Sequence, residues 1–221
     1  MFRCPFCQNW SLVFAEDCMN IKVEDIIKKL EGYKKFITGI CITGGEPTVQ
    51  FEGLMELLKN IQRIGLLNKL DTNGFYPDRI KRLLDLKLLN YVALDIKAPL
   101  VPDLYGEIIG KPDLGEEAVK NIISTLRNLK KSAIPFEART TIIPNCNDSE
   151  QEVEQIAKKL KGFNVPRYIL QQFRTLGGTL NKDFSEIPMT PYDNLVHLAE
   201  ISKKYISDVR IRTIEAGEEK I

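Results

Sequence analysis

The sequence predicts an α/β fold, an open or partial (β/α) barrel with parallel strands. Two observations predict it: short apolar runs alternate with amphipathic helical stretches, and at least five such units follow one another. Strands that are separated by helices pair in parallel through right-handed crossovers. A doubly wound sheet fits the same alternation and is the structural alternative.

The first half of the chain contains three predicted strands. Ile37–Thr43 is an apolar run that ends at glycines, and the helix Phe51–Ile64 follows it with apolar side chains on one face. Leu67–Asp71 is the second strand, and the helix Asp78–Leu86 again has its apolar residues at helical spacing. Leu89–Ile96 is the third strand.

The second half continues the pattern with three helices and three strands. Apolar residues recur at helical spacing in each helix, and a proline stops the fourth strand of the chain. Asn147 or Asp148 is the predicted N-cap of the second of these helices. In chain order the six segments are Leu114–Leu129, Phe136–Ile143, Asp148–Leu160, Tyr168–Phe173, Pro191–Ser207 and Val209–Thr213.

The length of 221 residues predicts a single domain that spans residues 1–221. Hydrophobic residues make up 43% of the chain, and the formal net charge of +1 argues against bulk nucleic acid or an anionic membrane as a partner. No apolar run is long enough to span a membrane and no signal region opens the chain, so we expect a cytoplasmic protein. Five cysteines do not suggest a disulfide framework, and the single histidine, His197, argues against a multi-histidine metal site or a Ser-His-Asp hydrolase.

Polar residues collect at the ends of five successive strands, where function gathers in parallel α/β folds. Each end alone has a plain structural explanation, such as an Asx turn, a helix N-terminus or an ion pair. Five together, downstream of a cysteine pair, favour one shared site. The five groups are Thr43-Gly44-Gly45-Glu46-Pro47, Asp71-Thr72-Asn73-Gly74, Asp95-Ile96-Lys97, Glu137-Ala138-Arg139-Thr140-Thr141 and Leu170-Gln171-Gln172-Phe173-Arg174.

Two residues separate Cys4 from Cys7, a spacing that lets two thiolates hold one metal centre. The glycines after the first strand allow close backbone approach to a ligand, and Glu46 can accept a hydrogen bond from an ammonium group. Asp95 and Lys97 share one face of their strand, so they either pair with each other or bind a carboxylate or a cation. Together these groups suggest a metal centre beside a site for a small zwitterion.

These motifs occur in an order and at distances by which the chain resembles the radical S-adenosylmethionine superfamily over nearly its whole length. Within it, the chain is similar to the glycyl-radical-enzyme activating enzymes, and most of all to the activating proteins of anaerobic ribonucleoside-triphosphate reductase. The motifs that carry the resemblance are Cys4-Pro5-Phe6-Cys7-Gln8-Asn9, Thr43-Gly44-Gly45-Glu46-Pro47, Asp71-Thr72-Asn73-Gly74, Asp95-Ile96-Lys97, Arg139-Thr140-Thr141-Ile142-Ile143-Pro144 and Leu170-Gln171-Gln172-Phe173-Arg174.

The resemblance implies a (β/α)6-type TIM-like partial barrel and a Cys-x3-Cys-x2-Cys motif that holds a [4Fe–4S] cluster. Cys4 and Cys7 match its second and third thiolates. The first would fall one position before Met1, so we expect a start codon placed too late and an N-terminally truncated domain without its first strand. If the protein begins at Met1, another cysteine would have to substitute, and none has the motif's spacing; the candidates are Cys18, Cys41 and Cys146.

The resemblance also implies the reaction. S-adenosylmethionine binds through its amino and carboxylate groups, receives one electron at its sulfonium, and breaks into methionine and a 5′-deoxyadenosyl radical. That radical takes a hydrogen atom from a glycine of a partner glycyl radical enzyme, either anaerobic ribonucleotide reductase or an enzyme of the pyruvate formate-lyase type. Ferredoxin or flavodoxin is the expected electron donor.

For the strand ends the resemblance implies separate roles. Gly44, Gly45 and Glu46 are expected to line the amino end of the methionine moiety, and Asp71 and Lys97 to lie near its polar groups.

Two further roles concern charged residues. Arg139 is expected to contact the ligand or the partner's glycine loop, or else to form a core ion pair with Glu137. Asp71, Thr72 and Asp95 match a pattern that holds a monovalent cation beside the carboxylate of the ligand.

Three other interpretations stay open. The chain could be a radical S-adenosylmethionine enzyme that acts on another substrate, although its scattered cysteines argue against auxiliary clusters. It could be a non-catalytic protein that binds zinc through Cys4 and Cys7, although structural zinc usually takes four ligands from two pairs. It could also be inactive for lack of the first cysteine. Iron with acid-labile sulfide, as against zinc, distinguishes the enzyme from the zinc protein.

Overall fold

The computed structural model describes residues 2–14, 18–175 and 177–221. They form one seven-stranded sheet in which the spatial order of the strands is their order in the sequence. Strands β1 to β6 are parallel, and β7 pairs antiparallel with β6. The strands are β1 (Gly39–Ile42), β2 (Leu67–Thr72), β3 (Tyr91–Asp95), β4 (Phe136–Ile142), β5 (Tyr168–Gln172), β6 (Val209–Thr213) and β7 (Gly217–Lys220).

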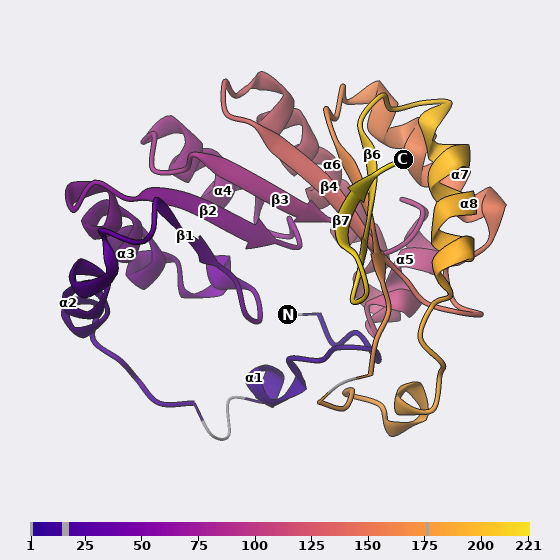
Figure 1. The fold of residues 1–221 in the computed structure, drawn as a ribbon, viewed down its shortest axis with the longest axis horizontal. Coiled ribbons are helices and arrows are strands. Elements are labelled where there is room, and N and C mark those ends of the chain that lie inside the picture. Colours follow the sequence, from indigo (N-terminus) through magenta and orange to yellow (C-terminus); the bar gives the residue numbers. More distant parts are fainter. Residues whose placement is uncertain (1, 15–17, 176) are drawn as a thin grey trace.

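This strand order confirms the partial barrel and rules out the doubly wound alternative. In a doubly wound sheet the order of the strands reverses at a switch point, and here it runs without reversal from β1 to β7. The sheet curls around an interior that is open on one side, with β1 and β7 at its two free edges (Figure 1). The first strand that the resemblance implies ahead of the cysteine motif would lie outside the described residues, so it stays a prediction.

Helices cover the outer face of the curled sheet (Figure 1). Four apolar residues at helical spacing in the longest helix, Ala118, Ile122, Leu126 and Leu129, are all fully buried. The helices are α1 (Trp10–Phe14), α2 (Val23–Tyr33), α3 (Phe51–Arg63), α4 (Pro77–Asp85), α5 (Pro102–Ile108), α6 (Gly115–Lys131), α7 (Glu150–Gly162) and α8 (Tyr192–Lys203). No helix in the described part of the chain is long and apolar enough to cross a membrane.

The predicted N-cap of helix α7 was wrong. Ser149 caps this helix, because its hydroxyl accepts a hydrogen bond from the backbone N–H of Glu152 at 3.3 Å. Asp148 instead accepts from the backbone N–H of Asn145 at 3.0 Å. Asn147 is buried and bonded to the ends of two neighbouring strands, so its side chain is not available to the helix.

The inner face of the sheet carries charged side chains at its centre. Side chains alternate between the two faces of a strand, so Asp71 on β2, Asp95 on β3 and Arg139 on β4 all point to the inside of the curled sheet. Arg139 lies directly beside Asp95 in the register of the sheet. The fold thereby concentrates ionisable groups near the C-terminal ends of the parallel strands.

Candidate functional site

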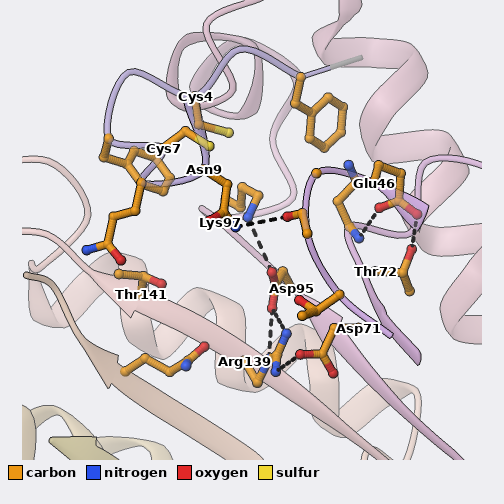
Figure 2. Close-up of a pocket in the computed structure, with 18 of the residues that line it drawn as sticks. Cys4, Cys7, Asn9, Glu46, Asp71, Thr72, Asp95, Lys97, Arg139 and Thr141 are labelled. Atoms are coloured by element: carbon orange, nitrogen blue, oxygen red, sulfur yellow. Dashed lines mark hydrogen bonds and ion pairs between the residues drawn. The ribbon is translucent and has the colours of Figure 1, made fainter. Parts of the chain in front are cut away.

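A cavity of about 270 Å³ lies at the C-terminal ends of the first five strands. The segment that carries the cysteines borders it on one side and the strand ends border it on the other (Figure 2). All ten residues predicted as cluster, cofactor or cation ligands line this one cavity: Cys4, Cys7, Gly44, Gly45, Glu46, Asp71, Thr72, Asp95, Lys97 and Arg139.

Cys4 and Cys7 belong to a tight turn in which the backbone N–H of Cys7 donates to the carbonyl of Cys4 at 3.0 Å. Both side chains lie on the cavity side (Figure 2). Burial raises the pKa of Cys4 to about 11, although the charge of Lys97 opposes it, and burial also raises the pKa of Cys7. Such thiols stay protonated until a metal deprotonates them. The soft donor pair therefore suits iron or zinc, and not a hard cation.

The described residues supply two thiolates to this site. No group of three or more His, Cys, Asp or Glu side chains among residues 2–14, 18–175 and 177–221 is placed to hold a metal ion. Cys18 and Cys41 are exposed, Cys146 is half-buried, and none of the three lines the cavity. The donor set fits two positions of an iron–sulfur cluster, and the third thiolate expected before Met1 stays a prediction.

The cysteine turn is held from two directions by segments distant in sequence. On one side, the backbone N–H of Arg3 donates to the carbonyl of Ile109 at 2.9 Å, just after α5. Gly110 makes this approach possible, because a Cβ atom at that position would overlap the carbonyl oxygen of Arg3. On the other side, the backbone N–H of Leu180 donates to the carbonyl of Cys7 at 3.1 Å.

Glu46 is buried and both of its carboxylate oxygens have partners. Oε1 accepts from the backbone N–H and hydroxyl of Thr48 and from the hydroxyl of Thr72 at 2.8 Å. Oε2 accepts from the backbone N–H of Asn73 at 2.8 Å. Burial raises the pKa of Glu46, although these hydrogen bonds oppose the rise. The plain explanation of Glu46 as the N-terminal residue of a short 3-10 helix is confirmed, and its contact to an ammonium group stays a prediction.

The Gly44–Gly45 turn faces the cysteine segment. Asn9 connects the two, because its side-chain amide donates to the carbonyl of Gly44 at 3.0 Å. Gly44 has a φ of +133°, a backbone conformation that favours glycine. The turn therefore presents bare backbone to the cavity, as the sequence predicts.

Arg139 bridges the carboxylates of two neighbouring strands. Its Nη1 lies 2.8 Å from Asp71 Oδ2, and its Nη2 lies 2.8 Å from Asp95 Oδ1. Burial alone would raise the pKa of Asp71, but the charges and hydrogen bonds of Arg139 and Lys69 together outweigh it and the pKa is lowered. The predicted alternative of a pair between Arg139 and Glu137 is wrong, because Glu137 instead accepts from the hydroxyl of Tyr91 at 2.7 Å.

Lys97 lies between the acidic strand ends and the cysteines (Figure 2). Its Nζ is 3.5 Å from Asp95 Oδ2, so the ion-pair interpretation of these two residues is confirmed. Burial alone would lower the pKa of Lys97, but the carboxylate of Asp95, together with Cys4 and Cys7 in their ionised form, outweighs it and the pKa is raised. Lys97 therefore brings a fixed positive charge to the wall of the cavity.

The three predicted cation ligands all have protein partners. Asp71 and Asp95 each bind Arg139, and the hydroxyl of Thr72 donates to Glu46. Arg139 contacts one oxygen of each carboxylate, Asp71 Oδ2 and Asp95 Oδ1. As they stand, these residues already hold a positive group, and the cation stays a prediction.

Among the lining residues without a predicted role, three are apolar and lie in the N-terminal segment, namely Phe2, Phe6 and Val13. They add an apolar wall beside the cysteines, and their closeness to Cys4 and Cys7 in the sequence was the only signal that could have found them. The cavity as a whole sets apolar surface, three cationic side chains and three carboxylates around a thiol pair. Such a site can bind a zwitterion through opposite charges and shield its reactive end from water.

The comparisons with known proteins agree with this chemistry. The family model described as the radical SAM superfamily matches residues 1–160. A candidate glycyl-radical enzyme activating enzyme of Methanocaldococcus jannaschii is 35% identical over 212 residues, which cover 96% of this chain and 85% of that protein. The pyruvate formate-lyase-activating enzyme of Clostridium pasteurianum is 27% identical over 183 residues, which cover 79% of this chain and 72% of that enzyme.

A solved structure has the same fold. A domain of the pyruvate-formate lyase-activating enzyme from Bacteroides vulgatus superimposes with a TM-score of 0.61 at 16% identity, over 79% of this chain and 99% of that one. The predicted nearness to activating proteins of anaerobic ribonucleoside-triphosphate reductase finds no support in these relatives and stays a prediction.

Proposed function

Because the chain belongs to the radical SAM superfamily, as an activating enzyme of glycyl radical enzymes, we propose that its cavity binds and reductively cleaves S-adenosylmethionine. One electron added to the sulfonium breaks its bond to the 5′ carbon and gives methionine and a 5′-deoxyadenosyl radical. The radical takes a hydrogen atom from a glycine of the partner, which leaves 5′-deoxyadenosine and a glycyl radical. The observation that carries the proposal is that all ten predicted residues line one cavity.

Cys4 and Cys7 would hold two irons of a [4Fe–4S] cluster, which supplies the electron when it is bound. The third thiolate of the family's spacing would stand four residues before Cys4, outside the printed sequence. Phe2 and Phe6 line the same wall and would help to exclude water from the cleavage reaction.

Charge decides how S-adenosylmethionine would be oriented. Arg139 already has two carboxylate partners at 2.8 Å, whereas Lys97 has one ion pair at 3.5 Å. Lys97 is thus the better partner for the ligand's carboxylate, and Arg139 keeps Asp71 and Asp95 in place on the inner face. The bare backbone of Gly44 and Gly45 would then receive the ammonium end.

The partner would be a glycyl radical enzyme, either of the pyruvate formate-lyase type or an anaerobic ribonucleoside-triphosphate reductase. The relatives named above favour the first of these. Ferredoxin or flavodoxin would deliver the electron. A radical S-adenosylmethionine enzyme with another substrate, or a zinc protein, remains the alternative that the experiment must exclude.

The test is anaerobic reconstitution with iron and sulfide, followed by reduction in the presence of S-adenosylmethionine. We expect 5′-deoxyadenosine and methionine in equal amounts from the wild type, and none from Cys4→Ala or Cys7→Ala. Cys146→Ala is the matched control, because this cysteine lies outside the cavity, and it should keep full cleavage. Cleavage by either cavity variant at the wild-type rate, or a protein that takes up zinc and no iron, would refute the proposal.

A further inference from the structure

We propose that Asn147 is a positioning residue that fixes the backbone at Lys97 and so determines where the Lys97 ammonium lies in the cavity. Asn147 does not line the cavity itself. The inference rests on the proposed function, because Lys97 is the group proposed to bind the carboxylate of S-adenosylmethionine.

Asn147 is only 1% exposed. Both its amide nitrogen and its amide oxygen make hydrogen bonds within the protein. Nδ2 donates to the carbonyl of Lys97 at 2.8 Å and to the carbonyl of Thr141 at 2.9 Å. Oδ1 accepts from the backbone N–H of Ile143 at 2.7 Å. One side chain thereby connects the segment after β3 with the end of β4.

The backbone at Lys97 needs such support because it lies beyond the end of a strand. Strand β3 ends at Asp95, and the last sheet-like bond is donated by the backbone N–H of Ile96 to the carbonyl of Arg139 at 2.8 Å. At Lys97, the main-chain hydrogen bonds within the described part of the chain are made to side chains. The hydroxyl of Tyr105 accepts from the N–H of Lys97 at 3.3 Å, and Asn147 binds the carbonyl of Lys97.

These contacts matter for the site because few other interactions fix the position of the Lys97 side chain. It is mostly buried and has a single ion pair, with Asp95 at 3.5 Å. A backbone shift of a few tenths of an ångström would move the ammonium relative to both Asp95 and the cysteines. Binding sites lose function when the residues that support the contacting groups are loosened.

Asn68 offers a matched control for a merely structural asparagine. It is also 1% exposed, and its Nδ2 donates to the carbonyls of Leu58 and Leu88 at 3.0 and 2.9 Å. It lies near the start of β2, at the opposite end of the sheet from the strand ends that form the cavity, and it does not line the cavity. Loss of the Asn68 amide removes two buried hydrogen bonds and loss of the Asn147 amide removes three, so both substitutions should lower stability, Asn147→Leu by more.

The experiment compares Asn147→Leu and Asn68→Leu in the full reconstituted chain, each with and without Lys97→Met. The measurements are the thermal midpoint and the dissociation constant of S-adenosylmethionine, obtained by equilibrium binding without turnover. We expect a lower thermal midpoint in both variants, with the larger loss in Asn147→Leu, and an affinity about fivefold or more weaker only for Asn147→Leu. In the Lys97→Met background, Asn147→Leu should weaken binding no further, because both changes act on one contact.

Asn147→Asp with Asn68→Asp gives a second pair if the leucine variants do not fold. Aspartate keeps the acceptor for Ile143 but turns an oxygen toward the carbonyls of Lys97 and Thr141. Equal affinities of the Asn147 and Asn68 variants, or the same weakening with and without Lys97, would overturn the positioning role. A wild type that assembles a cluster and binds no S-adenosylmethionine would refute the proposed function instead.

Discussion

The guanidinium of Arg139 pairs with two carboxylates on the inner face of the sheet. Without Arg139, the carboxylates of Asp71 and Asp95 would lie on one inner face without a partner shared between them. Removal of one member of a buried charge pair is costly because it leaves the other charge uncompensated. Arg139 therefore stabilises the fold as well as lining the cavity.

The pKa of Asp71 predicts how stability depends on pH. In the fold it is lowered from the ordinary value of 3.8, because the charges of Arg139 and Lys69 outweigh burial. A group with a lowered folded pKa stabilises the protein above its unfolded pKa, and this contribution is lost as the pH falls through the folded pKa. We expect Asp71→Asn to be less stable than the wild type at neutral pH, and the difference to shrink toward zero below about pH 4.

Thermal unfolding of the metal-free protein over this acidic range checks the expectation. Asp113→Asn is the control, because Asp113 is exposed and lies outside the cavity. A stability difference between wild type and Asp71→Asn that stays constant down to the lowest pH would show that the ion pair contributes nothing to the acid dependence.

At the scale of elements, the cysteine turn depends on parts of the chain that are far from it in sequence. The segment after α5 binds one side of the turn, and the segment around Leu180 binds the other. Fixing the backbone of the cysteine turn costs conformational entropy. The contacts from these distant segments help to offset that cost and so keep the two sulfurs in place. The segment after helix α5 and the segment 180–181 therefore support the cysteine turn.

Gly110→Ala tests the first support. Gly110 has a φ of +62°, and a Cβ atom there would overlap the carbonyl of Arg3. Gly65→Ala is the matched control, since Gly65 has a φ of +85° but no atom within 4 Å of its Cβ position. Both variants should lose about 1 kcal/mol from backbone strain, and only Gly110→Ala should also displace the cysteine turn.

The measurement is iron and acid-labile sulfide per chain after reconstitution, together with the free energy of unfolding. We expect Gly65→Ala to bind as much iron as the wild type and Gly110→Ala to bind clearly less. Equal iron content in the two variants would mean that the contact between Arg3 and the Gly110 turn does not support the metal site.

At the scale of the whole molecule, the order of the strands makes the site. Because β1 to β6 follow one another without reversal, their C-terminal ends form one curved edge, and the sheet stays open on one side (Figure 1). An interior with an open side leaves room for a macromolecular substrate, which a closed barrel filled with side chains does not. This geometry suits an enzyme whose substrate is a glycine within another protein.

Much of this arrangement could be predicted from local signals. The strand β6 has exactly the bounds that its alternating apolar residues indicate, and β4 and β5 end within one residue of the prediction. Strand β7 was missed because the charged sequence Gly217–Lys220 carries no apolar pattern, and it pairs with β6 through its backbone. Helices α1, α2 and α5 were also missed.

The contents of the cavity were predictable and its internal contacts were not. Strand ends meet at one edge in any parallel sheet, so the sequence was enough to bring Asp71, Asp95 and Arg139 together. The bridge that Arg139 makes depends on the register of three strands, which no local pattern reveals. Asn147 was predicted as a helix cap from its position just before a helical stretch. Its actual partner Lys97 is 50 residues away, so no local pattern could indicate the contact.

The central claim is that this chain generates a glycyl radical on a partner protein, and electron paramagnetic resonance tests it most directly. The reduced, reconstituted protein is mixed anaerobically with S-adenosylmethionine and, separately, with a pyruvate formate-lyase and an anaerobic ribonucleoside-triphosphate reductase from the same cells. We predict a glycyl radical signal on one of them, with 5′-deoxyadenosine formed in step, and no signal with Cys7→Ala. Cleavage of S-adenosylmethionine without a radical on either partner would contradict the account.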